Sequence, residues 1–196
     1  MNSQQTIINE IIRQRRSVFP KSYSGEKIDD ALIMQLLENA RWAPTHKFTE
    51  PWHFIVYSGA GLKKLGEQQA EIYKKHTQAD GTFKEERYEN LKHKPTEASH
   101  VIAVCMKRDK QKRIPEQEEL GAVFCAIQNM HLTASAYGIG CYLGTGGITY
   151  FEEAKELFGL AEEDTFIGFL YLGIPKEQVP DSRRRPIEEK LVWVKE

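Results

Sequence analysis

Two continuous apolar runs constrain the fold of this chain more than any other feature of its sequence. They are HVIAVCMKR at residues 100–108 and TFIGFLYLGIP at residues 165–175. Short uninterrupted runs of this kind are typical of strands that are buried on both faces of a sheet. WHFIVYSG at 52–59, rich in aromatic and β-branched residues, predicts a further short strand, and CYLGTGG at 141–147 predicts a strand that runs into a glycine-rich turn.

Helical patterns are interspersed with these strands. The spacing of apolar residues predicts helices over 3–14, 29–41, 61–76 and 119–138, and a short one within 151–159. Gly138 suits the C-terminal cap of the long helix, and Gly159 suits that of the short one, which a Thr149–Glu152 capping box opens. Because helices and strands interleave without regular βαβ units, we expect an α+β fold rather than a doubly wound sheet. The chain shows no repeat or linker, so residues 1–196 are predicted to form one domain.

The stretch from Lys74 to Ser99 is polar and charged, with Gly81 and Pro95 as breaks. It predicts a partly helical surface excursion. One interpretation is a solvated face, because charge runs usually remain in water. The other is a mobile cover over an active site, since long polar connections in compact domains are often functional.

Charge and apolar content exclude several functional classes. The 27 Lys and Arg residues balance the 28 Asp and Glu residues, which argues against a nucleic-acid or membrane-surface protein. No apolar run approaches the roughly 20 residues that span a bilayer. The first residues contain no continuous apolar segment of a secretory signal, so we expect a cytoplasmic protein.

The cysteines and histidines offer no metal or disulfide site. Cys105, Cys125 and Cys141 form no C-x-x-C pair, and Cys105 and Cys125 stand within apolar runs, so all three are expected to be structural. The six histidines lack metal-ligand spacing. We therefore expect no metal.

Two groups of arginines stand at opposite ends of the chain. Arg15, Arg16 and Ser17 come where the first helix is predicted to end, and SRRRP covers residues 182–186. Guanidinium groups match phosphate oxygens, and a hydroxyl adds a short hydrogen bond. In an extended chain Arg183 and Arg185 point to the same side. The two groups suggest one anionic ligand held from both ends, although helix-end cations and solvated basic patches explain each group separately.

Two further segments have the composition of a binding site. LGTGG at 143–147 would let backbone N–H groups approach a flat ring, or would simply form the turn that ends a strand. It matches neither a Rossmann fingerprint nor a P-loop. RWAPTHKFTEPWHF at 41–54 places Trp42, His46 and Trp52 around two prolines in a connecting segment. His46 either binds a ligand or caps a backbone group.

Taken in order, these motifs resemble the FMN-dependent nitroreductase family along nearly the whole chain. The resembling features are RRS after the first helix, APTHKFTEPWHF, the long helix ending in YGIG, LGTGG, FLYLGIP and RRRP-x-E-E. The chain is most similar to a compact bacterial branch in which A-P-x-H-K-x-x-x-P-W-H-F replaces A-P-S-x-x-N-x-Q-P-W. The stretch 74–99 carries no part of the resemblance.

The resemblance implies a mainly antiparallel sheet flanked by helices, in an intertwined homodimer with two FMN sites at the interface. It places cofactor-binding residues in both chains: Arg15, Arg16, Ser17, Trp42, His46, Leu143, Gly144, Thr145, Arg183 and Arg185. Trp42 and His46 are implied to come from the partner chain. The nicotinamide donor, NADH or NADPH, is placed near residues 133–138. The implied activity is hydride transfer through flavin N5 to a small acceptor such as a nitroaromatic or quinone.

This sequence differs from the family pattern in two places. The commoner branch has Asn and Gln near the positions of His46 and Glu50, and the closer branch often has Arg at the position of Trp42. Because the cofactor carries the redox chemistry, no catalytic acid or base is assigned. Rival hypotheses are a module that stores or delivers FMN without turnover, a flavin enzyme with another task such as dehalogenation, and an interaction domain without cofactor.

Overall fold

The protein is built on one antiparallel four-stranded sheet. A computed structural model describes residues 3–195. The strands, in their order across the sheet, are β1 (Trp52–Ser58), β2 (His100–Met106), β4 (Thr165–Gly173) and β3 (Gly140–Gly144). All three neighbouring pairs are antiparallel. The two continuous apolar runs of the sequence are thus the two central strands, as expected for strands covered on both faces.

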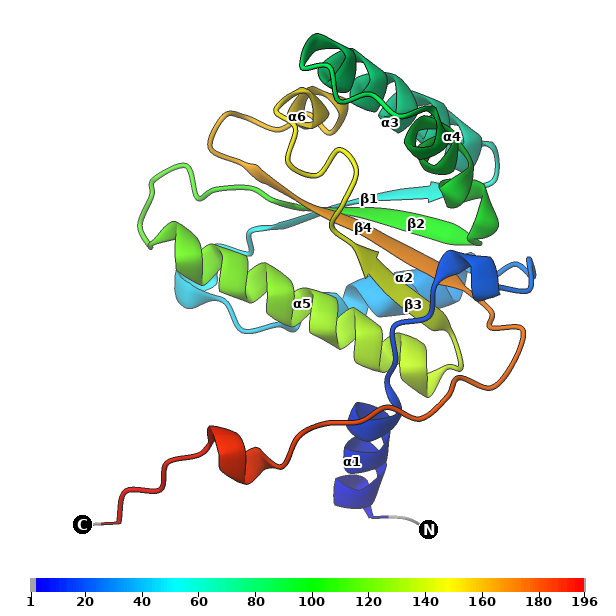
Figure 1. The fold of residues 1–196 in the computed structure, drawn as a ribbon. Helices are drawn as coiled ribbons and strands as arrows, with labels where there is room; N and C mark the ends of the chain where they lie inside the picture. The colour runs from blue at the N-terminus through cyan, green and yellow to red at the C-terminus, as the bar shows by residue number, and fades with distance from the viewer. Residues whose placement is uncertain (1–2, 196) are drawn as a thin grey trace.

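Helices cover both faces of this sheet (Figure 1). The α-helices are α1 (Gln4–Gln14), α2 (Asp30–Ala40), α3 (Ala60–Ala79), α4 (Glu85–His93), α5 (Glu116–Ala136) and α6 (Glu153–Leu157). Short 3-10 turns occur at η1 (Pro20–Ser22), η2 (His46–Phe48), η3 (Lys94–Glu97) and η4 (Ile187–Lys190). Helices α2 and α5 pack on one face, and α3, α4 and α6 pack on the other.

The alternation of side chains along β2 explains why its sequence is apolar throughout. Ile102, Val104 and Met106 contribute to the core under α2 and α5. Val101, Ala103 and Cys105 contribute to the core under α3, α4 and α6. Successive residues of a strand point to opposite faces, so a strand between two helical layers needs an apolar residue at every position.

Two segments extend away from this body (Figure 1). Helix α1 has the apolar face that the sequence predicts, but none of its residues is buried. Ile7, Ile8 and Ile12 are each 45–50% exposed. At the other end, residues 181–195 are exposed throughout, including apolar side chains between Ile187 and Val194.

The polar stretch 74–99 is more ordered and more buried than its composition suggests. Helix α3 continues to Ala79, and α4 packs against α3. Leu91 and Pro95 are buried beneath this pair. The predicted partly helical surface excursion is thus confirmed, since most of its residues are exposed or half-buried, and a few apolar side chains are enough to dock its charged helix.

Two smaller expectations are wrong. Thr149 does not open a capping box: its hydroxyl donates to the Gly146 carbonyl, and α6 begins only at Glu153. Cys125, expected to be buried because its neighbours are apolar, is exposed on the outer side of α5. The glycine caps hold, since Gly138 and Gly159 both have positive φ after α5 and α6.

Candidate functional site

Residues 15–17 lie directly beside the strand that leads into the glycine-rich loop. After α1 ends, Ser17 forms a parallel bridge with Cys141 of β3, and the Val18 N–H donates to the Cys141 carbonyl at 3.0 Å. Two segments that the sequence separates by more than a hundred residues are thereby neighbours. From Cys141, the partner of Ser17, β3 runs three more residues, about 10 Å, to Gly144.

Arg15 is half-buried at the point where α1 meets α5 and β3. Burial and, to a smaller extent, the positive charge of Arg15 together lower the pKa of His131 on α5 to about 4. Burial raises the pKa of the Cys141 thiol, which Arg15 partly offsets. Among the described residues His131 Nδ1 has no hydrogen-bond partner. The Arg15 guanidinium and the buried, unbonded Nδ1 of His131 therefore lie in the same region, next to Ser17.

Arg16, the neighbouring arginine, makes contacts of a different kind. Its Nε donates to the Pro180 carbonyl at 3.2 Å, and its Nη2 approaches Asp181 Oδ1 at 3.4 Å. Its Nη1 donates to the carbonyls of Arg13 and Arg15. The guanidinium group thus ties the start of the C-terminal segment to the end of α1. This places Pro180 and Asp181 beside the end of α1. The tail then continues to Arg183 and Arg185, which are exposed and make no hydrogen bond or ion pair to residues 15–17 among the described residues.

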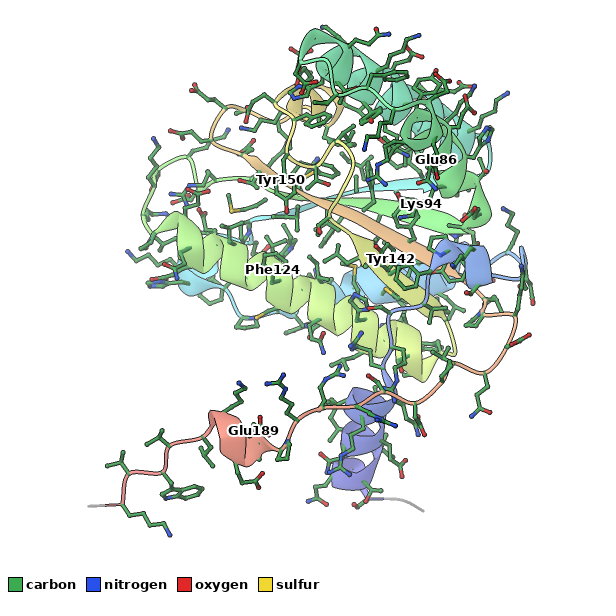
Figure 2. All side chains as sticks on the ribbon, viewed as in Figure 1. Glu86, Lys94, Phe124, Tyr142, Tyr150 and Glu189 are labelled. Carbon is green, nitrogen blue, oxygen red and sulfur yellow. The ribbon has the colours of Figure 1, made fainter. Side chains whose placement is uncertain are left out.

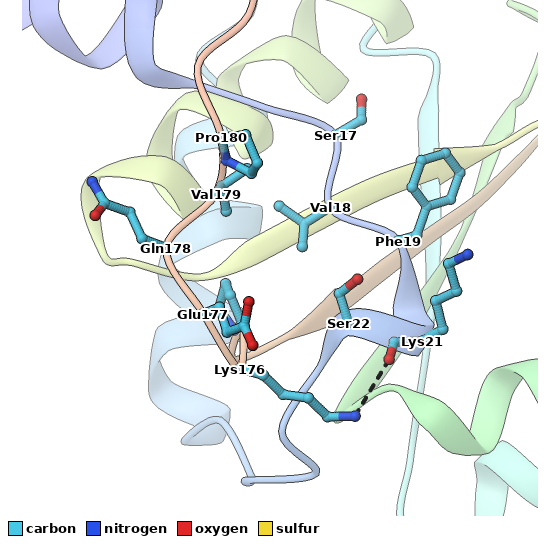
Figure 3. A pocket seen from close by; sticks show the side chains of 11 residues that line it. Ser17, Val18, Phe19, Lys21, Ser22, Lys176, Glu177, Gln178, Val179 and Pro180 are labelled. Atoms are coloured by element: carbon cyan, nitrogen blue, oxygen red, sulfur yellow. Dashed lines mark hydrogen bonds between the residues drawn. The ribbon is translucent and has the colours of Figure 1, made fainter.

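A cavity of about 420 Å³ opens between these two segments (Figure 3). It is bounded by residues 17–22 on one side and 175–180 on the other. Ser17, Phe19 and Lys21 line its first wall, and the Lys176 ammonium donates to the Lys21 carbonyl across it. Its volume lies in the range of small-molecule sites, roughly 300–1,000 Å³.

The glycine-rich loop faces two cations that the sequence reasoning missed. Lys94 Nζ lies 4.8 Å from the ring centres of Tyr142 and Tyr171, on β3 and β4. Arg87 lies over Gly146 and Gly147. Burial lowers the pKa of Lys94, and the charge of Arg87 lowers it further. The available signal was their spacing of seven residues, which places them on one side of a helix.

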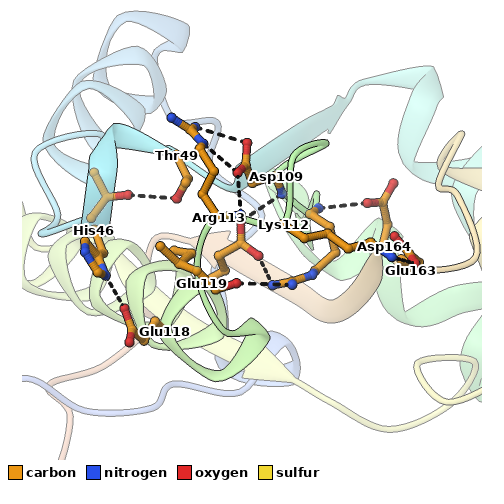
Figure 4. Close-up of polar contacts among 12 residues, drawn as sticks. His46, Thr49, Asp109, Lys112, Arg113, Glu118, Glu119, Glu163 and Asp164 are labelled. Atoms are coloured by element: carbon orange, nitrogen blue, oxygen red, sulfur yellow. Dashed lines mark hydrogen bonds and ion pairs between the residues drawn. The ribbon is translucent and has the colours of Figure 1, made fainter.

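Trp42 and His46 lie on a strained segment between α2 and β1, and Figure 4 shows His46. Trp42 is 73% exposed, and its indole N–H donates to Glu38 at 3.2 Å. His46 Nδ1 is hydrogen-bonded to Glu118, in the first turn of α5. Three residues of this loop adopt positive φ although none is glycine: Lys47, Phe48 and Glu50. Such conformations cost free energy and are typical of binding loops.

Within one chain, His46 cannot share a ligand with Arg15. His46 contacts Glu118 near the beginning of α5, whereas Arg15 lies by His131 near its end. Thirteen residues of helix separate these two points, about 20 Å at 1.5 Å per residue. The structure therefore brings Arg15, Arg16 and Ser17 near the strand that carries Leu143, Gly144 and Thr145, but leaves His46 at the other end of α5. Trp42 follows the end of α2, where Asn39 bonds to Asn129 and Thr133 of α5.

Two other kinds of site find no support in the described residues. Between residues 3 and 195, no three His, Cys, Asp or Glu side chains come close enough together to hold a metal ion. Over the same residues, no helix has both the length and the apolar composition needed to cross a membrane.

An antiparallel sheet between two helical layers, with Arg15, Arg16 and Ser17 beside the strand that leads to a glycine-rich loop, defines an α+β protein. The chain belongs to the Nitroreductase family, whose sequence profile matches residues 12–174. It is 30% identical to a Bacillus subtilis protein provisionally named NAD(P)H nitroreductase YfhC, over 96% of this chain and 94% of that one.

Solved structures show the same fold. The nitroreductase-like family protein from Bacillus cereus superposes with a TM-score of 0.85 at 29% identity, over 100% of both chains. The FMN-dependent nitroreductase NfnB from Mycobacterium smegmatis, solved in complex with NADPH, gives a TM-score of 0.76 at 17% identity, over 98% of this chain and all of the other. The α+β fold with a mainly antiparallel sheet, implied by the sequence motifs, is thus confirmed.

Proposed function

We propose that this protein is an FMN-dependent NAD(P)H oxidoreductase of the nitroreductase type, in which residues 1–196 form one FMN-binding domain. The observation that carries the proposal is the contact between residues 15–17, the start of β3 and the tail at 180–181, next to a cavity of about 420 Å³. Arg15 and Arg16 lie there, and Pro180 and Asp181 hold the tail that continues to Arg183 and Arg185. This is the arrangement that a phosphorylated flat ligand requires.

The phosphate end of the ligand is assigned to Arg15 and Ser17. Arg15 has no ion-pair partner among residues 3–195, and Ser17 is exposed beside it. Arg16 is engaged with Pro180 and Asp181, so its role is to hold the tail where Arg183 and Arg185 can reach the phosphate. The two adjacent arginines thus have separate tasks, one in binding and one in positioning.

The ring end is assigned to Leu143, Gly144 and Thr145. A Cβ at Gly144 would lie 3.2 Å from the rings of Tyr142 and Tyr171, so this glycine keeps a shallow surface open. Lys94, half-buried between those rings, supplies a positive charge at that surface. When bound, FMN supplies the redox centre that takes hydride from NADH or NADPH and passes it to the acceptor. The residues bind it, orient it and favour its negatively charged form.

A second copy of the chain is needed to complete this site. His46, bonded to Glu118, lies about 20 Å along α5 from Arg15 in its own chain. Pairing two copies with their α5 helices antiparallel would bring this loop of one copy to the arginines of the other. The exposed apolar side chains of α1, Phe124 on α5, and the tail offer the surface for such a homodimer.

The direct test is an absorbance spectrum of the purified protein, followed by anaerobic titration with NADH and NADPH. We expect flavin absorbance that bleaches with a nicotinamide and recovers with a nitroaromatic or quinone. A protein that takes up no flavin on reconstitution with FMN overturns the proposal. A protein that binds flavin but shows no steady-state NAD(P)H consumption is instead a storage or delivery module.

Three arginines at the end of α1 provide matched variants. Arg15→Ala should weaken FMN binding by about 2 kcal/mol, the usual loss for a hydrogen bond to a charged group. Arg16→Ala should first release the tail and weaken the dimer. Arg13→Ala removes only an exposed side chain and should change neither FMN binding nor dimerisation. Fluorescence titration with FMN measures all three. Equal affinity in the Arg15 and Arg13 variants would place the phosphate elsewhere.

A further inference from the structure

Arg87 on α4 lies over the glycine-rich loop at close range. A Cβ added at Gly146 would lie 3.2 Å from Arg87 Nη2, and one added at Gly147 would lie 3.9 Å from it. Lys94, two helical turns further along, lies 3.8 Å from the same position on Gly144. The loop is therefore built of glycines where these two cations approach it.

Neither cation has an anionic partner among residues 3–195. No ion pair or side-chain hydrogen bond involves Arg87 or Lys94 in that part of the chain. The neighbouring Lys92 of α4 is different, because it pairs with Glu89, to which His93 Nε2 is also hydrogen-bonded. Burial and the charge of Arg87 lower the pKa of Lys94, as expected for two like charges in a partly buried place, and the charge of Glu97 only partly offsets this. An arrangement of this kind is stabilised by a bound anion.

These side chains line a small cavity of about 100 Å³. That is the volume of roughly three water molecules, enough for a carboxylate. Gln69 lies buried at its inner side, where its amide donates to the Leu91 carbonyl at 2.6 Å. Arg87 and Asn90 are exposed at its outer edge. Tyr142, labelled with Lys94 in Figure 2, adds an aromatic wall.

We propose that Arg87, with Asn90, selects the electron acceptor, and that the preferred acceptor is an aromatic compound carrying a carboxylate. This inference rests on the proposed function, because it concerns what is reduced at that site. Arg87 lies over Gly146 and Gly147, beyond the residues 143–145 assigned to the flavin ring, and it is exposed to solvent, where an acceptor enters. Lys94, the inner cation, remains with the flavin.

The test compares two acceptors of nearly equal size, 4-nitrobenzoate and the neutral 4-nitrobenzyl alcohol. The flavin is first reduced chemically, so that binding of the nicotinamide donor does not contribute. Reoxidation by each acceptor then gives a second-order rate constant. We expect the natural protein to favour 4-nitrobenzoate. Arg87→Gln should lower that rate constant by about tenfold or more, the usual cost of losing a charged hydrogen bond, and leave the alcohol unchanged.

Two more variants keep the result unambiguous. Arg87→Lys retains the charge and should recover part of the preference. Lys92→Gln removes a cation of the same helix that already pairs with Glu89, and should leave both acceptors unaffected. Equal rate constants for the two acceptors in the natural protein, or an equal loss for both in Arg87→Gln, would overturn the inference.

A binding measurement separates this inference from the proposed function. Benzoate, which cannot be reduced here, is titrated calorimetrically into the protein as purified, with and without the Arg87→Gln change. Binding that depends on Arg87 supports the anion site even if no flavin is taken up, in which case the proposed function fails alone. Flavin turnover with benzoate binding that does not depend on Arg87 means that the anion site fails alone.

Discussion

The sheet with its two helical layers and the two segments that leave it follow opposite rules of burial. In the body, Leu65 on α3 and Met130 on α5 are completely buried, and β2 is buried at every position. In the projecting segments, α1 buries none of its residues and Trp193 of the tail is 71% exposed. The described part of the chain therefore contains a well-buried core and two segments whose apolar side chains are exposed to solvent.

The body has a complete core within one chain, and the exposed apolar side chains of the projecting segments support the proposed homodimer. An isolated helix of 11 residues is marginal in water, so α1 gains little stability without tertiary contacts. Exposed apolar clusters on otherwise ordinary surfaces mark interaction sites. Because Arg15 and Arg16 stand at the junction of α1 and the body, the proposed flavin site depends on both parts.

Removing residues 183–196 should have the largest effect on function and almost none on the body. The deletion eliminates Arg183, Arg185 and the apolar tail, but no residue of either core. We expect loss of the dimer and a fall of FMN affinity by about tenfold or more, since two charged phosphate contacts disappear. Sedimentation and flavin absorbance measure these two outcomes.

The circular dichroism and thermal midpoint of the truncated chain serve as its control. A truncated protein that unfolds would place the tail in the folding core, contrary to the comparison. One that stays dimeric with full flavin content would show that α1 and α5 suffice for the interface.

Within the body, Gly66→Ala should be severely destabilising, by about 3 kcal/mol or more for overpacking that cannot relax. A Cβ at Gly66 of α3 would lie 2.0 Å from the Lys92 carbonyl of α4, so the two helices would have to separate. Gly61→Ala is the matched control in the same helix, because its nearest contact is a side-chain atom of Tyr57 at 3.8 Å. Urea denaturation compares the two; similar midpoints would mean that α4 is loosely attached.

Sequence reasoning succeeded where structure depends on local burial patterns. The apolar runs at 100–108 and 165–175 predicted the two central strands because each residue there faces one core or the other. The glycine caps at Gly138 and Gly159 were equally local. The order of the strands, and the bridge that places Ser17 beside Cys141, depend on tertiary contacts that no single segment encodes.

The candidate site was predictable only in part, for the same reason. Two adjacent arginines look equivalent in sequence, but Arg16 is engaged by the tail whereas Arg15 faces His131. Arg87 and Lys94 belong to a stretch whose composition indicates a solvated surface, and only the docking of Leu91 turns that helix toward the glycine loop. Cys125 looks buried from its neighbours because the helix exposes one narrow side among apolar residues.

At the junction of the two regions, His131 should make stability depend on pH. Its folded-state pKa of about 4 lies below the ordinary value of 6.5, so folding favours the neutral form. As pH falls below 6.5, the unfolded state binds a proton at His131 before the folded state does. The free energy of unfolding is therefore highest above pH 6.5 and falls by about 3 kcal/mol in all as pH approaches 4. His131→Gln removes this loss, which urea denaturation at pH 7 and pH 4.5 detects. An unchanged slope in the variant would assign the acid sensitivity to other groups.

FMN binding provides a further test of this pH dependence. A negative charge beside Arg15 opposes the effect of that arginine on His131, so FMN should reduce the loss of stability at low pH. If FMN leaves the pH dependence of the natural protein unaltered, its phosphate does not lie near the junction of α1 and α5.

The smallest effect is expected from Ile12→Ala, and its value lies in the contrast with Ile33→Ala. Ile33 on α2 is 3% exposed within the core, so its truncation should cost about 2–5 kcal/mol at any protein concentration. Ile12 on α1 is 50% exposed, and its truncation should change the stability of the single chain by less than about 0.5 kcal/mol. Its cost should appear only as weaker dimerisation, because a second copy is what would cover it. Denaturation at several protein concentrations separates the change in single-chain stability from the change in dimerisation. A loss for Ile12→Ala that does not vary with concentration would mean that α1 already packs within its own chain.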